Sequence, residues 1–251
     1  MPATIRRARP LLGTLVEVGL CLEHHPMTAI AAAFAEITRL QALLSRFDPG
    51  SEIARFNRLP PGSRMAVALA TREVLAFARQ LADDTGGAFD ITLGSAPDGW
   101  HLDADGCLHK RVAQTRLDLG GIAKGYIVDR AVQALREHGA GAGWVNAGGD
   151  LRAFGEIDVP IVLRDESHGG ARPFAQLADG AFATSHYGVE TRSQLSRFAP
   201  RHRGAQHAAN CHVSVAAPHC LHADALTKIV ALSGDTSHPL LARYGAQAWL
   251  H

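Results

Sequence analysis

Apolar residues recur along the chain with two different periods, and these periods predict its helices and strands. Between residues 27 and 44 they recur every three to four positions, which predicts an amphipathic helix. Residues 71–85, 126–138 and 223–233 show the same spacing. A shorter helix is expected to begin at Ser51, because a serine hydroxyl can cap the first turn.

Short segments of alternating or mainly apolar residues predict strands. Single strands are expected at residues 15–20, 144–146, 151–154, 159–163, 182–185 and 211–215. Residues 101–112 are expected to form a hairpin around Asp105-Gly106, and residues 240–250 a short helix followed by a last strand. Leu117 and Leu119 are expected to close a further strand. Because helices and strands are mixed without strict alternation, we expect the α+β class. We expect a single domain over residues 1–251, with its softest boundary at 164–170.

The charge balance gives no general attraction to polyanions. Lys and Arg total 25 against 24 Asp and Glu, a formal net charge of +1, so neither nucleic acid nor an anionic membrane is the expected partner. Glu17 interrupts the apolar stretch near the N-terminus, and no segment reaches the roughly 20 apolar residues of a membrane helix. We expect a cytoplasmic protein, or a periplasmic one if the natural chain begins earlier.

A glycine pair lies where an expected strand leads into an expected helix. The sequence D-L-G-G-I-A-K-G places Asp118, Gly120, Gly121 and Lys124 around this point. Backbone N–H groups at a helix entrance attract anions, and a lysine adds positive charge. The spacing is neither that of a P-loop nor that of a dinucleotide fingerprint, so a tight turn explains the glycines equally well.

Two further features each have a functional and a structural interpretation. Gly148-Gly149-Asp150 is either part of a binding site or simply a turn between strands. Asp224, near the start of an apolar helix, is either a ligand for Mg²⁺ or an acidic residue that complements the helix dipole.

Seven short motifs occur in one order along nearly the whole chain. They are Leu12-Gly13-Thr14, SRFDPGSEIARFN (45–57), GGAFDITLG (86–94), DLGGIAKGY (118–126), NAGGD (146–150), ATS (183–185) and ADAL (223–226). Each motif alone is weak, but in this order they resemble the FAD:protein FMN transferases, the ApbE-like family. The resemblance implies mixed sheets flanked by helices and a reaction that uses FAD and Mg²⁺. In that reaction FMN is attached to a threonine of a target protein, and AMP is released.

The resemblance also implies roles for individual residues. Leu12 stands where the family has a methionine, Phe47 takes an aromatic position beside the flavin, and the turn at Gly120-Gly121 lines the pyrophosphate. The implied cofactor contacts are Leu12, Phe47, Ala88, Phe89, Asp90, Gly120, Gly121, Lys124, Tyr126 and Phe198. The implied metal ligands are the Ala123 carbonyl, Asp224 and Thr227. The implied catalytic residues are Asp224 and Ser196, which occupies the position of a family histidine.

The chain departs from the family pattern at two places. Ser196 stands where the family has its presumed basic histidine, and Ala199 replaces an aspartate. A serine hydroxyl does not take up a proton near neutral pH. Lys228 stands where the family has a threonine, four residues after Asp224, with Thr227 beside it. An ammonium there is expected to form a salt bridge with Asp224 and to weaken or abolish metal binding.

Three functions follow from these observations. The first is FMN transfer from FAD to a threonine of an acceptor protein. The alternatives are a non-catalytic FAD-binding protein that has lost the base and the metal site, and an FAD pyrophosphatase that yields FMN and AMP.

Overall fold

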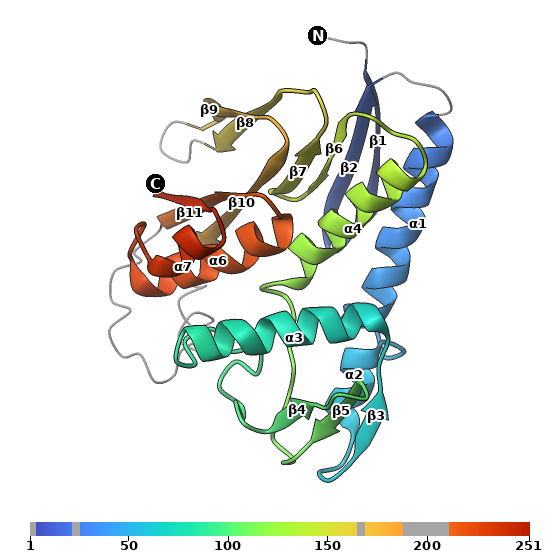
Figure 1. Ribbon diagram of the computed structural model, residues 1–251, viewed down its shortest axis with the longest axis vertical. Helices are drawn as coiled ribbons and strands as arrows, with labels where there is room; N and C mark the ends of the chain where they lie inside the picture. The colour runs from blue at the N-terminus through green and yellow to red at the C-terminus, as the bar shows by residue number, and fades with distance from the viewer. Residues whose placement is uncertain (1–3, 22–25, 165–168, 188–210) are drawn as a thin grey trace.

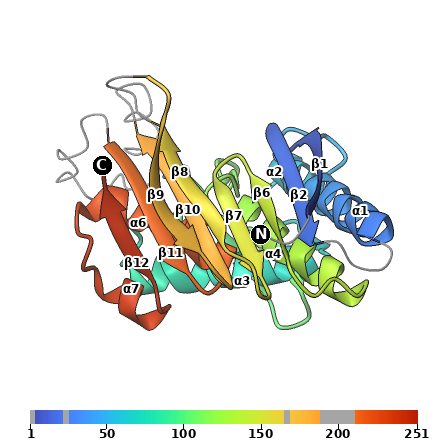
Figure 2. The same ribbon diagram turned by 90° about the horizontal axis from the view of Figure 1, so that it is seen from above.

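A seven-stranded antiparallel sheet forms the centre of the protein. The computed structural model describes residues 4–21, 26–164, 169–187 and 211–251. The strand order of the large sheet is β1-β2-β6-β7-β10-β11-β12, and Figure 2 shows these strands side by side. Their bounds are Thr4–Leu11, Thr14–Cys21, Gly143–Ala147, Asp150–Phe154, Gly180–Tyr187, Cys211–Ala217 and Gln247–Leu250. Every pairing in this sheet is antiparallel.

Three helices bury their apolar sides against one face of this sheet. They are α1 (Pro26–Leu44), α4 (Ala123–Glu137) and α6 (Cys220–Ser233), and Figure 1 shows α4 and α6 following one another along the sheet. Strand residues such as Val18, Ala183 and Val215 share one core with these helices. The opposite face holds a smaller core under the hairpin of β8 (Val159–Arg164) and β9 (Ala171–Leu177). This arrangement of helices and sheets confirms the α+β class.

The predicted helix at residues 27–44 is α1, and its apolar stripe is buried. Phe34, Ile37 and Leu40 each have at most 1% of their surface exposed. Among the described residues, α1 is the one helix whose length and hydropathy would also suit a membrane span, as core helices of globular proteins often do. Its contacts with α4 and β2 account for its apolar stripe as part of the core.

A second group of elements lies below the helices in Figure 1. It consists of α2 (Glu52–Arg58), α3 (Leu69–Asp84) and a small sheet of β3 (Arg64–Ala66), β5 (Cys107–Lys110) and β4 (Trp100–Leu102). As predicted, the Ser51 hydroxyl caps α2 by accepting from the Ala54 N–H at 3.0 Å. The predicted hairpin around Asp105-Gly106 is formed by β4 and β5. After α6, α7 (Pro239–Arg243) leads into β12.

The structure differs from the expected elements in two ways. Leu117 and Leu119 do not close a strand, because this segment is a loop. The Asn57 side chain holds the loop: its amide oxygen accepts from the Leu117 N–H at 2.7 Å, and its amide nitrogen donates to the Leu117 carbonyl oxygen at 2.9 Å. The sequence pattern also misses β1, β3 and β9. Most positions of β1 and β9 are exposed, so their polar residues hide the alternation on which the prediction depends.

Candidate functional site

The site lies where the N-terminal turn of α4 approaches the N-terminal half of α6. Gly125 makes this approach possible, because a Cβ at this position would lie 2.3 Å from the Cys220 carbonyl oxygen and 2.8 Å from the Asp224 Cβ. The Gly125 N–H donates a 3.0 Å hydrogen bond to Asp224 Oδ2. A glycine in the DLGGIAKGY motif therefore brings the α4 entrance directly onto the Asp224 carboxylate.

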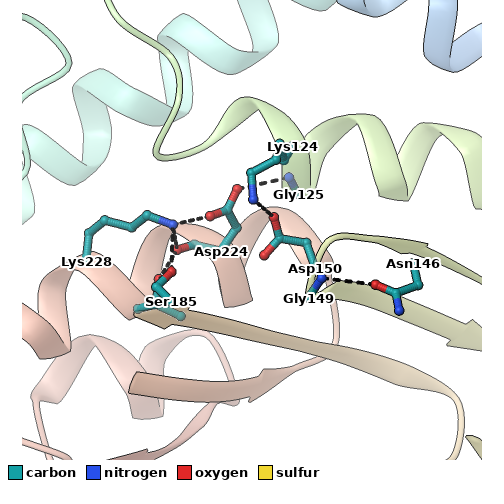
Figure 3. Close-up of polar contacts among 9 residues, drawn as sticks. Lys124, Gly125, Asn146, Gly149, Asp150, Ser185, Asp224 and Lys228 are labelled. Carbon is teal, nitrogen blue, oxygen red and sulfur yellow. Dashed lines mark hydrogen bonds and ion pairs between the residues drawn. The ribbon is translucent and has the colours of Figure 1, made fainter. Parts of the chain in front are cut away.

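Two lysine–aspartate pairs lie next to each other at this crossing (Figure 3). Lys124 Nζ on α4 lies 2.5 Å from Asp150 Oδ2 on β7. The ammonium of Lys228 bonds Asp224 Oδ1, one turn earlier on α6. Both carboxylates are buried, whereas 35% of the Lys124 side chain is exposed. The cluster therefore balances two positive and two negative charges, with Lys124 on its solvent side.

Burial and the neighbouring charges shift these groups in different directions. Burial, followed by the charge of Asp224, raises the pKa of Asp150 to about 6. Burial acts in the same direction on Asp224, but the two lysine ammonium groups outweigh it and hold the pKa of Asp224 below its usual value. Burial opposes the charge of Lys228, yet Asp224 outweighs it and raises the pKa of Lys228. Asp224 and Lys228 are therefore a stable ion pair.

Hydroxyl groups from β10 and α6 complete the surroundings of the Lys228 ammonium. Ser185 Oγ lies 3.4 Å from Lys228 Nζ and 2.8 Å from Thr227 Oγ1. The Thr227 hydroxyl donates to the Asp224 carbonyl oxygen at 2.7 Å, and Lys228 Nζ donates to the same carbonyl at 2.9 Å. Three oxygen atoms from Asp224 and Ser185 therefore surround one ammonium.

The described residues do not fit a Mg²⁺ ion at Asp224. One carboxylate oxygen of Asp224 holds the Lys228 ammonium, and the other accepts from the Gly125 N–H. The expected salt bridge between Lys228 and Asp224 is thus present, and it fills the position that a metal would need. Within the part of the chain that the structure describes, no group of three or more His, Cys, Asp and Glu side chains is arranged to hold a metal ion.

The structure brings several of the sequence motifs together around this cluster. The space for a Cβ on Gly121 is bounded by the Lys228 side chain, whose Cε would lie 3.6 Å away. The Asp118 carboxylate pairs with the Arg46 guanidinium of the 45–57 motif at 3.0 Å. The backbone N–H of Asp118 donates to the carbonyl oxygen of Ile91, in the 86–94 motif, at 2.8 Å.

The Leu12-Gly13-Thr14 turn meets the NAGGD turn next to this cluster. A Cβ on Gly148 would lie 2.4 Å from the Thr14 hydroxyl oxygen. Gly148 has φ +63°, a left-handed conformation that glycine adopts without strain. The motifs at 12–14, 45–57, 86–94, 118–126, 146–150, 183–185 and 223–226 are thus neighbours in space as well as an ordered series in sequence.

Several residues assigned to the cofactor have structural partners of their own. The Asp90 carboxylate accepts from the Thr92 N–H and hydroxyl at 2.8 Å and from the Gly94 N–H at 3.0 Å. The Tyr126 hydroxyl donates to Glu73 of α3 at 2.5 Å. These contacts stabilise the loop and the α3–α4 packing, so any contact of these side chains with FAD stays a prediction.

The remaining assigned residues differ widely in exposure. Phe89 is 1% exposed, whereas Phe47 is 79% exposed and lies under the Arg46 guanidinium, 4.2 Å from its ring centre. Ala88 is partly buried, and the Leu12 N–H donates to Gln41 at 2.7 Å. Ser196, Phe198 and Ala199 lie outside the described residues.

The sequence patterns place Asp150 in a candidate binding turn and give Ser185 no role, whereas the structure places Asp150 against Lys124 and Ser185 against Lys228. Asp150 belongs to the NAGGD motif and Ser185 to the ATS motif. A buried carboxylate beside a glycine turn and a hydroxyl at the end of an apolar strand are the signals that could have identified them.

Comparison with known proteins gives one consistent result. The sequence pattern of the ApbE family matches residues 12–107 and 100–250. An FAD:protein FMN transferase of Treponema pallidum (strain Nichols) is 26% identical in an alignment of 186 residues, and the match covers 59% of this chain and 51% of that protein. The match therefore spans about half the length of this curated relative.

Solved structures resemble the whole chain. The apo flavinyl transferase ApbE of Pseudomonas stutzeri has a TM-score of 0.78 and 25% identity, covering 99% of this chain and 90% of that one. The ApbE protein of Thermotoga maritima has a TM-score of 0.82 and 23% identity, covering 99% and 94%. The flavin transferase ApbE of Vibrio cholerae has a TM-score of 0.80 and 19% identity, covering 100% and 94%. These similarities establish the fold of the chain.

Proposed function

The chain belongs to the ApbE family, and on this premise we propose that it is an FAD:protein FMN transferase. Its substrates are FAD and an acceptor protein with a threonine side chain. The threonine oxygen attacks the phosphorus atom of the FMN half of FAD. A bond from this oxygen to phosphorus forms, the phosphoanhydride bond breaks, and AMP leaves with the bridging oxygen. The hydroxyl proton is released, so the products are the FMN-threonine ester, AMP and a proton.

The charge distribution at the α4 entrance is the observation that carries this proposal. A pyrophosphate is an anion whose transfer requires stabilisation of the negative charge that moves onto the leaving group. The N-terminal end of a 15-residue helix, the positive charge on the partly exposed Lys124 side chain and the glycine turn at Gly120-Gly121 all favour an anion there.

The two aspartates of the cluster hold the lysines in place for this role. Asp150 begins β7, directly after the Gly148-Gly149 turn, and its carboxylate fixes the end of the Lys124 side chain. A positioned charge loses less entropy when it meets the substrate than a freely moving lysine does. In this proposal, Lys124 binds the pyrophosphate and Asp150 positions Lys124.

Removal of the threonine proton is the step for which the chain lacks the family residue. Ser196 replaces the histidine that the family resemblance assigns as base. This substitution favours a second candidate function, a protein that binds FAD and carries out no transfer.

A direct assay distinguishes these functions. Purified protein is incubated with FAD and a threonine-bearing acceptor, with and without Mg²⁺. Mass spectrometry then detects the FMN adduct, and chromatography detects AMP. An acceptor whose threonine is replaced by valine is the matched control. Adduct on the threonine acceptor alone supports transfer, AMP without adduct indicates a pyrophosphatase, and FAD binding without either product indicates a binding protein.

A further inference from the structure

The Lys228 ammonium lies among oxygen atoms of the kind that bind hard cations. Its contacts are Asp224 Oδ1, the Asp224 carbonyl oxygen at 2.9 Å and Ser185 Oγ at 3.4 Å. Carboxylate, carbonyl and hydroxyl oxygens are also the ligands that Mg²⁺ prefers. The ammonium therefore occupies a cation position that is built from protein oxygens.

The rest of the Lys228 side chain keeps the ammonium in this position. The residue is 8% exposed, and the carbons Cγ, Cδ and Cε border the space above Gly121, between 3.6 and 3.8 Å from where its Cβ would be. These are ordinary van der Waals distances, so the stem lies against the turn at Gly121. The side chain would have to leave this packed position, and Asp224 would have to give up its partner, before a dissolved ion could enter.

Charge balance makes entry of a divalent ion still less favourable. Lys124 and Lys228 already neutralise Asp150 and Asp224, and Lys124 acts on Asp224 as well. A Mg²⁺ ion added to this neutral cluster would meet two nearby ammonium groups and one fully buried carboxylate that is already paired.

From these contacts we infer that Lys228 takes the place of a divalent metal ion, and that this chain binds the pyrophosphate of FAD without Mg²⁺. The inference rests on the proposed flavin function, because it concerns the same site. Lys228 contributes a fixed positive charge behind the phosphates, and the more exposed Lys124 donates to them directly. The long contact to Ser185 is the one that a phosphate oxygen can most easily replace at the Lys228 ammonium.

Two binding measurements on the full chain test this inference. Flavin fluorescence gives the affinity for FAD in EDTA and in Mg²⁺, and Mn²⁺ electron paramagnetic resonance gives the affinity for a divalent ion in the absence of FAD. We expect equal FAD affinity in both buffers and no Mn²⁺ bound at the site. In Lys228→Thr, which opens the cation position, we expect Mn²⁺ binding and an FAD affinity that Mg²⁺ raises by about 5- to 150-fold, the usual range of coupling between two ligands.

The wild-type measurements decide the question even if the variant does not fold. A wild-type FAD affinity that requires Mg²⁺ would overturn the inference and leave the proposed transfer intact, and so would Mn²⁺ binding that a folded Asp224→Asn variant loses. Metal-independent FAD binding without adduct formation would overturn the transfer and support the inference. Absence of FAD binding in both buffers, with a native circular dichroism spectrum, would overturn both.

Discussion

Lys228 and Asp224 lie one turn apart on α6, and the ammonium of the first is held by both the carboxylate and the carbonyl oxygen of the second. The carboxylate is fully buried and lies beside the entrance of α4. The Asp224–Lys228 pair therefore affects both the packing of α4 against α6 and the electrostatic potential of the candidate site.

Removal of one partner is expected to destabilise the fold. Asp224→Ala leaves a buried ammonium without its carboxylate, which should lower the free energy of unfolding by about 3–5 kcal/mol. The double change Asp224→Ala with Lys228→Met should recover part of this loss. Asp84→Ala is the control, because Asp84 pairs with Arg243 at the surface and should cost at most about 1 kcal/mol. Urea unfolding gives the free energy of unfolding of all three variants. Equal decreases in Asp84→Ala and Asp224→Ala would contradict the interpretation of Asp224–Lys228 as a buried ion pair.

Loss of the Lys124 ammonium should weaken FAD binding. Lys124→Met removes a charge-assisted contact, for which about 1.5–3 kcal/mol is typical, so the affinity should fall by about 10- to 150-fold. Arg136→Met is a control, because Arg136 lies in the last turn of the same helix. Fluorescence titration with FAD measures both, and an unchanged affinity in Lys124→Met would remove Lys124 from the pyrophosphate site.

Asp150 should titrate far above an ordinary aspartate. Its pKa is raised to about 6 by burial and then by the charge of Asp224, so carboxyl carbon NMR of labelled aspartate should show a midpoint near that pH. Asp224→Asn should shift the midpoint downward, because it removes the second cause. Asp103 is an internal reference, since its hydrogen bond with His109 lowers its pKa.

The sign of the stability effect of Asp150 follows from the same shift. A folded-state pKa above the unfolded value means that the native state holds this proton more tightly. The contribution of Asp150 to the free energy of unfolding is therefore complete below about pH 4 and is lost as the pH rises through about 6. A titration midpoint of Asp150 near 4 would show that burial does not perturb the group.

A methyl group at Gly125 should separate the two helices of the site. In Gly125→Ala the new Cβ would lie 2.3 Å from a backbone oxygen that cannot rotate away, so we expect a loss of about 1–3 kcal/mol and weaker FAD binding. Gly180→Ala is the matched control, because the nearest atom to its Cβ would lie at 3.5 Å. Thermal unfolding and FAD titration of both variants test the prediction, which fails if Gly125→Ala behaves like Gly180→Ala.

Local patterns predicted the long helices, because these depend on the spacing of residues within one helix. The pair of Asp224 and Lys228 was expected from the departure of the chain from the family pattern at residue 228. Local patterns could not predict that Lys124 would meet Asp150, 26 positions away, since that contact depends on how α4 packs on β7. The same limit applies to Leu117, whose backbone bonds the side chain of Asn57 instead of a neighbouring strand. The order of the motifs indicated the family, and tertiary packing determined the partner of each charged group.

The pair of Asp224 and Lys228 also bears on how such a site changes during evolution. Both residues lie within α6, so exchange of lysine for threonine at 228 changes one side chain of this helix. Lysine and threonine codons can differ by a single nucleotide. On the inference that Lys228 replaces a metal ion, we expect one point mutation to convert this site between dependence on an ion from the surrounding solution and a positive charge that is encoded in the gene.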